Sequence, residues 1–207
     1  MADDDFIRAG AIILRDFALL NKATIFYEEQ VAPIITNAVE TLIKDWTQEK
    51  FWKGEIDAPD TFTTIWVCPG TWQDDPEEEP VARFKLGHRN EEATSSYEIA
   101  DLLNLGQTDF GFWFEPEYSW FGGKSKWNAF SKTIGDIAEE LGKKGWINEG
   151  KGTFFRPIAL AADLRVSAWE NDDWSEVLAP LRVALDDLEA DQKIFDRILM
   201  RGNPKQG

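Results

Sequence analysis

The stretch 109-DFGFWFE-115 carries the clearest strand signal in this chain of 207 residues. Phe110, Phe112 and Phe114 fall on one face of an extended segment and the intervening residues on the other, because side chains alternate along a strand. Aromatic residues suit a pleated, buried surface. We therefore expect a central strand here, with Phe112 buried in the core.

Further strand patterns flank this segment on both sides. Residues 61–68 are β-branched and aromatic, residues 81–87 alternate between apolar and polar, and residues 153–160 repeat the aromatic, β-branched composition. A further strand at 164–169 would bring the number to five. Because no strand–helix–strand rhythm repeats, these four or five strands favour a mostly antiparallel sheet.

Helical periodicity occupies the two ends of the chain. Apolar residues recur at helical spacing through 6–20 and again through 31–46, which predicts two helices or one kinked helix. Near the other end, a capping box at Asp173–Glu176 precedes an apolar stripe that continues to about Leu199, as in a long C-terminal helix.

The fold class expected from these patterns is α+β, with a mostly antiparallel sheet of four to five strands packed by helices. Residues 1–52 form the N-terminal helical pair and residues 53–207 the α+β body. The length suits one compact domain overall.

The charge of the chain restricts its partners. A formal net charge of −16 arises from 38 acidic and 22 basic residues. Such a protein is repelled by nucleic acid and by anionic membrane surfaces, and it is attracted to basic proteins. We therefore expect a basic protein partner, with no direct binding to nucleic acid or to a membrane.

Compartment and redox chemistry follow from the termini and the cysteine count. The N-terminal Met-Ala-Asp-Asp-Asp lacks the positive charge of a secretory signal, and the apolar stretch after it is short and interrupted by charges. Cys68 is the single cysteine, which excludes an internal disulfide and a cysteine-based metal site. A cytoplasmic protein is the expectation.

The loop 122-GGKS-125 resembles the end of a phosphate-binding loop, G-x-x-x-x-G-K-[ST]. The first glycine of that motif is replaced by Tyr118, and Trp120 and Phe121 fill the loop with bulky side chains. Backbone N–H groups need room to close around a phosphate. We therefore interpret the segment as a glycine turn that starts a helix, with Trp127 facing inward.

Three enzyme patterns have weaker support. Glu149 and Lys151 supply the Glu-x-Lys of a metal-dependent nuclease, yet glycines flank them as in a turn. His88, the single histidine, lies in a predicted solvated turn, and no serine or cysteine lies in a nucleophile motif. Glu115 and Glu117 adjoin aromatic residues, as in glycosidases, but also as at a strand end.

An acidic run beside tryptophan is the strongest binding signal. The segment 73-QDDPEEEP-80 follows Trp72 and contains five carboxylates in six positions. Carboxylates rimmed by aromatic side chains suit an arginine-rich protein surface. The predicted partner-binding residues are Trp72, Asp74, Asp75, Glu77, Glu78, Glu79, Glu115 and Glu117.

The function predicted from the sequence is that of an acidic, non-catalytic binding protein or inhibitor. It would occlude a basic functional surface of a partner, such as a nuclease or another nucleic-acid-binding effector, in the manner of immunity proteins, antitoxins and DNA-mimic inhibitors. No metal or cofactor is expected. The alternatives are a degenerate PD-(D/E)xK-type nuclease using Glu149 and Lys151, or a soluble accessory protein whose charge has no role in binding.

Overall fold

A computed structural model describes residues 4–57, 62–73, 75, 77–93, 95 and 97–202, with side chains described from Ile7 onward. The chain divides into two compact units, Met1–Ala38 and Val39–Gly207. The division falls inside helix α3 (Ala32–Lys50).

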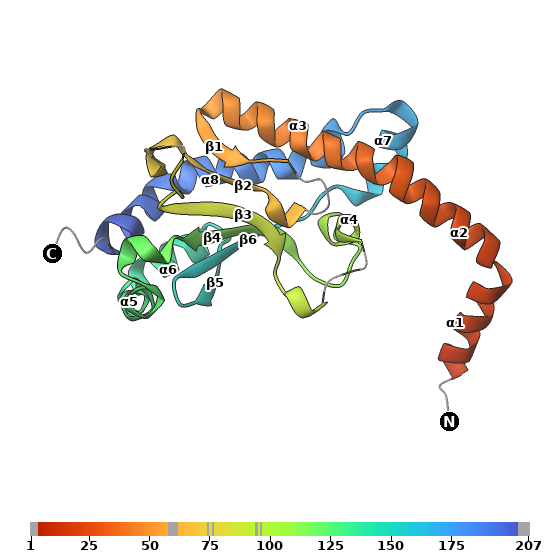
Figure 1. The fold of residues 1–207 in the computed structure, drawn as a ribbon, viewed down its shortest axis with the longest axis horizontal. Helices are drawn as coiled ribbons and strands as arrows, with labels where there is room; N and C mark the ends of the chain where they lie inside the picture. Colours follow the sequence, from red (N-terminus) through yellow and green to blue (C-terminus); the bar gives the residue numbers. More distant parts are fainter. Residues whose placement is uncertain are drawn as a thin grey trace. The chain divides into compact units, whose positions relative to one another are not determined.

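The first unit is entirely helical. It contains α1 (Asp4–Arg15), α2 (Phe17–Phe26), a π-helical turn (Tyr27–Val31) and the beginning of α3. The chain bends between α1 and α2 (Figure 1), where Asp16 leaves the helical conformation with φ −104° and ψ 21°. Within the described residues, no helix is both long and apolar enough to cross a membrane.

The second unit is built on one antiparallel sheet with the strand order β1-β2-β3-β4-β6-β5. Its strands are β1 (Trp52–Glu55), β2 (Trp66–Pro69), β3 (Ala82–His88), β4 (Phe110–Pro116), β5 (Ile147–Gly150) and β6 (Thr153–Ile158). The α+β class and the antiparallel sheet are confirmed, and β4 is central. A Cβ at Gly111 would lie 2.0 Å from the Arg156 carbonyl oxygen, so the close approach of β6 requires glycine there.

The predicted number of four to five strands is wrong, since the described sheet has six. The edge strands β1 and β5 were not predicted, because each has four residues and is too short for a clear alternation. The strand expected at 164–169 is instead helical, as a 3-10 turn (Ala162–Leu164) followed by α7 (Arg165–Asn171).

The remaining helices are α4 (Glu98–Leu102), α5 (Lys124–Phe130), α6 (Gly135–Lys143) and α8 (Ser175–Gly202). The long C-terminal helix is confirmed, and it runs without interruption for 28 residues. Its first turn is capped by Asp173, whose Oδ1 accepts a hydrogen bond of 2.9 Å from the Ser175 N–H. This carboxylate satisfies one of the donors that a helix start leaves without an intrahelical partner.

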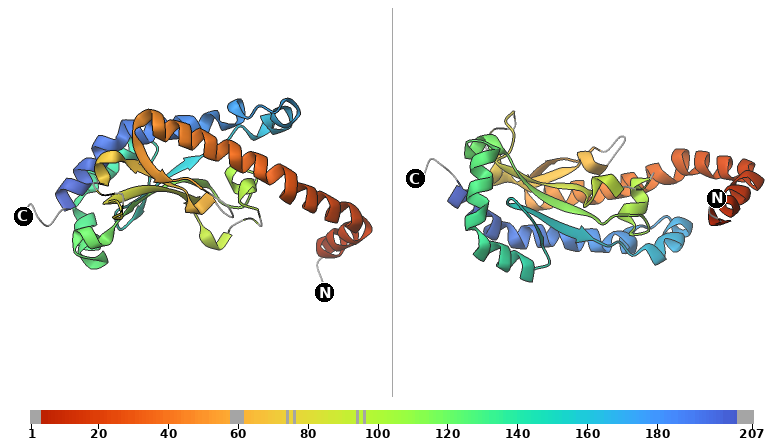
Figure 2. Two further views of the ribbon diagram at one scale, coloured as in Figure 1. Left: turned by 45° about the horizontal axis from the view of Figure 1, so that its top comes forward. Right: turned by 90° about the horizontal axis from the view of Figure 1, so that it is seen from below.

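The core lies between the sheet and a layer formed by α8 and the Val39–Lys50 part of α3 (Figures 1 and 2). Phe84 on β3 is at its centre and contacts Phe195 of α8, with ring centroids 5.0 Å apart. Trp46 of α3 donates a 2.9 Å hydrogen bond to Asp186 of α8, which ties the two helices together. Phe112 is fully buried, as the alternation predicted.

Candidate partner-binding site

The acidic loop, residues 73–80, leads from the 3-10 turn Gly70–Trp72 to β3. Asp75 organises it, because its carboxylate accepts a 2.9 Å hydrogen bond from the Glu77 N–H and its carbonyl one of 3.1 Å from the Glu78 N–H. The described carboxylates of the loop are all exposed, namely Asp75, Glu77, Glu78 and Glu79. Asp74 lies outside the described residues.

The end of this loop meets the predicted carboxylates of β4 in a small hollow of about 350 Å³, which we call the acidic pocket. Glu79, Glu115 and Glu117 line it, together with Arg83, Trp113 and Tyr118. The register of the sheet brings them together, since Arg83 on β3 pairs with Glu115 on β4. Three of the predicted site residues, from two separate segments, therefore share one pocket.

Negative charge dominates the acidic pocket. Arg83 bridges two of its carboxylates, at 3.2 Å from Glu79 and 3.4 Å from Glu115. One guanidinium thus stands among three carboxylates. Burial raises the pKa of the Tyr118 hydroxyl, and the carboxylates of Glu115 and Glu117 raise it further. The pocket therefore favours cationic groups over anionic ones.

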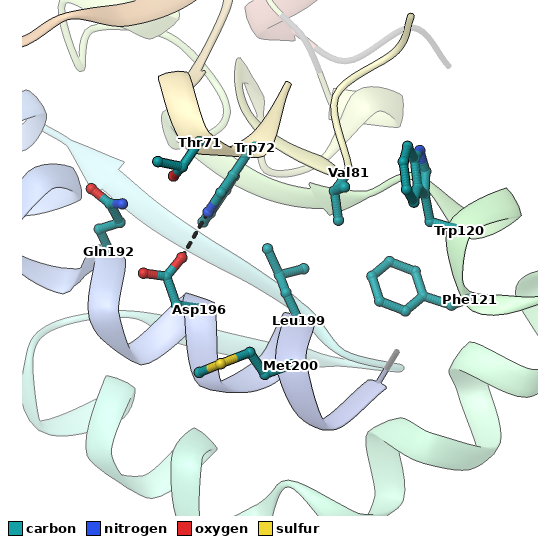
Figure 3. A pocket seen from close by; sticks show the side chains of 9 residues that line it. All are labelled: Thr71, Trp72, Val81, Trp120, Phe121, Gln192, Asp196, Leu199 and Met200. Atoms are coloured by element: carbon teal, nitrogen blue, oxygen red, sulfur yellow. Dashed lines mark hydrogen bonds between the residues drawn. The ribbon is translucent and has the colours of Figure 1, made fainter. Parts of the chain in front are cut away.

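A second hollow of about 520 Å³, the apolar groove, lies between the loop and the C-terminal end of α8 (Figure 3). Trp72 forms one wall, buried and held by a 2.7 Å hydrogen bond from its indole N–H to Asp196. Leu199 and Met200 of α8 form another wall. The aromatic side is supplied by Trp120 and Phe121 of the 3-10 turn Tyr118–Phe121.

The groove exposes different side chains from those that the sequence singled out. Trp72 packs against Phe84, with ring centroids 5.3 Å apart, and presents little surface to a partner. Trp120 is 40% exposed, and Met200 is also exposed. Sequence reasoning missed both residues, because Met200 lies far away in the sequence and Trp120 was assigned to the glycine loop. The exposed apolar surface of the groove is formed jointly by α8 and the 3-10 turn Tyr118–Phe121.

The acidic pocket and the apolar groove adjoin each other. Val81 lines the groove, while Pro80 just before it and Arg83 two residues after it line the pocket. The Glu117 N–H donates a 2.8 Å hydrogen bond to the Val81 carbonyl, which joins the two segments that border both hollows. Carboxylates and exposed apolar side chains therefore lie side by side on this part of the surface.

The loop that contains Gly122 and Gly123, which we call the glycine loop, does not form a phosphate-binding site. The N–H groups of its two glycines are donated within the loop, from Gly122 to the Ser119 carbonyl at 3.2 Å and from Gly123 to the Tyr118 carbonyl at 2.9 Å. The Lys124 ammonium lies over the Tyr118 ring, 5.8 Å from its centroid. As expected, α5 starts at Lys124 and buries Trp127.

We expect no binding of ATP or GTP, because the N–H groups of Gly122 and Gly123 are already donated within the loop and carboxylates adjoin it. Isothermal titration of the protein with either nucleotide and Mg²⁺ should show no heat of binding. Micromolar affinity that disappears in the Lys124→Ala variant would contradict this prediction.

The candidate nuclease residues lie at the edge of the sheet. Glu149 is on β5 and accepts a 2.8 Å hydrogen bond from Arg89, which also bonds Asp109 at 3.2 Å. A guanidinium therefore stands between the two carboxylates. Lys151 is in the hairpin turn, with a left-handed φ of 54° and its carbonyl bonded by the Trp127 indole at 2.8 Å.

His88 was predicted to be solvated, which is wrong, because it is buried at the end of β3. Its Nε2 lies 3.2 Å from the carboxylate of Asp101, and that carboxylate accepts a 2.7 Å hydrogen bond from the Ser95 hydroxyl. A serine hydrolase needs the histidine next to the nucleophile, whereas the carboxylate stands between them here. Burial raises the pKa of the Cys68 thiol to about 12, so it is not a thiolate at neutral pH.

Metal chemistry has no ready site in the described part of the chain, where no group of three or more His, Cys, Asp or Glu is placed to hold an ion. Comparisons with protein-family models, curated proteins and solved structures found no match to this chain.

Proposed function

We propose that this protein is a non-catalytic, acidic binding protein that docks on a basic functional surface of another protein and occludes it. The observation that carries the proposal is the juxtaposition of the acidic pocket with the apolar groove. A partner would place arginine or lysine side chains among the carboxylates and an apolar side chain against Trp120 and Met200.

Charge supports the first half of this arrangement. Asp75, Glu77 and Glu78 are exposed on the loop, and Glu117 lines the pocket beside it. Arg83 illustrates the recognition, since its guanidinium already lies within 3.4 Å of two carboxylates. Guanidinium groups pair well with carboxylates, and opposite charge accelerates encounter between proteins.

Apolar surface supports the second half. Aromatic and methionine side chains are enriched in protein interfaces, and a few central residues, tryptophan among the most frequent, supply most of the binding energy. The groove offers Trp120 and Met200 in this role, with Trp72 as a rigid wall behind them. The indole of Trp72 is fixed by Asp196, so the wall is preorganised.

The partner class follows from the same chemistry. A nuclease or another nucleic-acid-binding effector presents basic side chains for phosphates, and the carboxylates of this protein would take the place of those phosphates, as in an immunity protein, an antitoxin or a DNA mimic. We expect this protein to meet its partner in the cytoplasm, because its single cysteine is buried and forms no disulfide that would need an oxidising compartment.

Neutralising the carboxylates should weaken binding through the association rate. The probe is a 20-residue helical peptide of leucine and arginine, and its counterpart carries glutamate in place of arginine. In the variant with Asp75→Asn, Glu77→Gln, Glu78→Gln, Glu79→Gln and Glu117→Gln, the affinity for the basic peptide should fall at least about tenfold, or about 1.4 kcal/mol. Surface plasmon resonance at two salt concentrations measures both rates.

The control removes five exposed carboxylates elsewhere, by Glu91→Gln, Glu92→Gln, Asp163→Asn, Glu170→Gln and Asp172→Asn. It should bind with nearly unchanged affinity. Equal loss in both variants would mean that only net charge matters, as in the accessory-protein alternative. Equal binding of the basic and acidic peptides would contradict the proposal altogether.

The apolar half is tested separately by Trp120→Ala, which should raise the dissociation rate of the basic peptide and leave its association rate nearly unchanged. Trp169→Ala on α7 is the matched control, because Trp169 is 39% exposed and Trp120 is 40% exposed. The same effect from both variants would show that the groove is not the contact surface.

A further inference from the structure

The N-terminal unit exposes an apolar surface that the proposed function does not use. Among the described side chains of α1 and α2, nine large apolar ones are between 45% and 75% exposed. They are Ile7, Ile12, Ile13, Leu14, Phe17, Leu19, Leu20, Ile25 and Phe26. No residue of α2 is buried, although most of its sequence, FALLNKATIF, is apolar.

The size of this surface exceeds what a monomer normally leaves in water. With roughly 200 Å² for a fully exposed large apolar residue, the nine side chains together expose on the order of 1,000 Å². The largest apolar patch on a typical monomer is about 300–600 Å². A stable interface covers about 800 Å² on each partner, so this surface is large enough to hold two chains together.

The apolar side chains point in several directions around α2, so more than one neighbouring helix is needed to cover them. At 100° per residue, Leu19 and Leu20 point about 100° apart on α2, and Ile25 lies on a third side. A helix that is apolar on all sides is normally covered on all sides. A second copy can meet this need, because it brings both an α1 and an α2.

The charges of this unit disfavour a lipid surface as the occupant. Residues 1–38 contain three cations, Arg8, Arg15 and Lys22, against six carboxylates, namely Asp3, Asp4, Asp5, Asp16, Glu28 and Glu29. Helices that lie in a membrane interface are typically rich in lysine and arginine, which attract anionic lipids. With a formal charge of −3, this unit lacks that attraction.

We propose that α1 and α2 pack against α1 and α2 of a second copy of the chain and hold it in a dimer. The contact is isologous, so that each copy offers the same apolar surface to the other, as in most symmetric dimers. This contact goes beyond the proposed function, because it uses a different surface of the protein. The dimer would present two copies of the acidic pocket and the apolar groove. Paired sites raise the apparent affinity for a partner with repeated basic segments.

The test uses the full chain and measures its mass by sedimentation velocity over a range of micromolar concentrations. The unaltered protein should sediment as a dimer. The double variant Ile13→Glu, Leu20→Glu places charges in the apolar surface, and its dimer dissociation constant should rise at least about 100-fold. Both positions are exposed, so the circular dichroism spectrum should stay unchanged.

The matched control is Val166→Glu, Val183→Glu, which adds the same charges at two apolar positions of α7 and α8 that are each 58% exposed. It should remain dimeric. A monomeric unaltered protein, or equal dissociation of both variants, would overturn the proposal. Flotation with vesicles of phosphatidylcholine and phosphatidylglycerol tests the lipid alternative. If the unaltered protein is monomeric and binds the vesicles, and the Ile13→Glu, Leu20→Glu variant does not bind them, the apolar surface binds a membrane and the dimer proposal is wrong.

Discussion

Replacing Phe84 by alanine is expected to lower the free energy of unfolding by about 4–5 kcal/mol, at the upper end of the range for a buried phenylalanine. Phe84 is fully buried at the centre of the core. Its ring has five aromatic neighbours, at centroid distances from 5.0 to 5.9 Å. These are Trp52, Trp72, Phe114, Trp146 and Phe195.

The loss should be large because the cavity left by Phe84 borders β3, its neighbouring strands and α8 together, and rigid rings cannot collapse into it. Urea unfolding followed by tryptophan fluorescence measures the change. Phe51→Ala is the control, since Phe51 is 87% exposed and its loss should cost less than about 0.5 kcal/mol. A cost below about 1 kcal/mol for Phe84→Ala would mean that the sheet and α8 do not pack as described.

Replacing Asp101 by asparagine should destabilise the protein by about 2–4 kcal/mol at pH 7, although the two side chains have nearly the same shape. The carboxylate of Asp101 is buried and accepts hydrogen bonds from the N–H groups of Ser95, Gln107 and Thr108 and from the Ser95 hydroxyl, at 2.7 to 3.3 Å. These bonds join the segment before α4, which contains Ser95, to the loop between α4 and β4, which contains Gln107 and Thr108. An amide is a weaker acceptor and carries no charge.

The effect should depend on pH in a defined direction. Burial opposes the charged form of Asp101, but the hydrogen bonds from Ser95, Gln107 and Thr108 outweigh burial and hold its pKa below the ordinary value of 3.8. A lowered folded-state pKa contributes stability above the unfolded-state pKa, and this contribution is lost as the pH falls through the folded-state value. The difference in the free energy of unfolding between the native protein and the Asp101→Asn variant should therefore become smaller below about pH 4.

Urea unfolding at pH 7, 5 and 3 tests this expectation, with the exposed Asp163→Asn as the control for a carboxylate outside the cluster. If the free energies of unfolding of the native protein and the Asp101→Asn variant differ by the same amount at all three pH values, the lowered pKa of Asp101 is contradicted. The carboxylate would then keep its stabilising effect in acid.

The sequence was a reliable guide where local pattern decides structure. The alternation around Phe112 predicted β4, and the apolar stripe after Asp173 predicted α8, because each pattern continues long enough to specify one face. Short elements lack that length. The four residues of β1 are a strand because β2 pairs with them, and residues 165–171 form a helix despite their strand-like composition.

The candidate site was partly visible in the sequence. The acidic loop and the carboxylates Glu115 and Glu117 were singled out from composition and from neighbouring aromatic residues. Their meeting in one pocket was not foreseeable, since it depends on the pairing of Arg83 with Glu115 across β3 and β4. His88 was wrongly predicted to be solvated for the same reason, because its burial and its proximity to Asp101 depend on segments outside its own strand.

The sequence by itself determined the charge of this protein, its α+β class and the position of its carboxylates along the chain, because these follow from composition and short-range periodicity. Only the tertiary structure decided that Trp72 is a buried wall of the groove, that Trp120 and Met200 line the groove with exposed side chains, and that the pocket and groove adjoin. The physical reason is that burial and adjacency depend on which distant segments pack together. Strand register and the docking of α8 specify that packing, and neither is encoded within a single stretch of sequence.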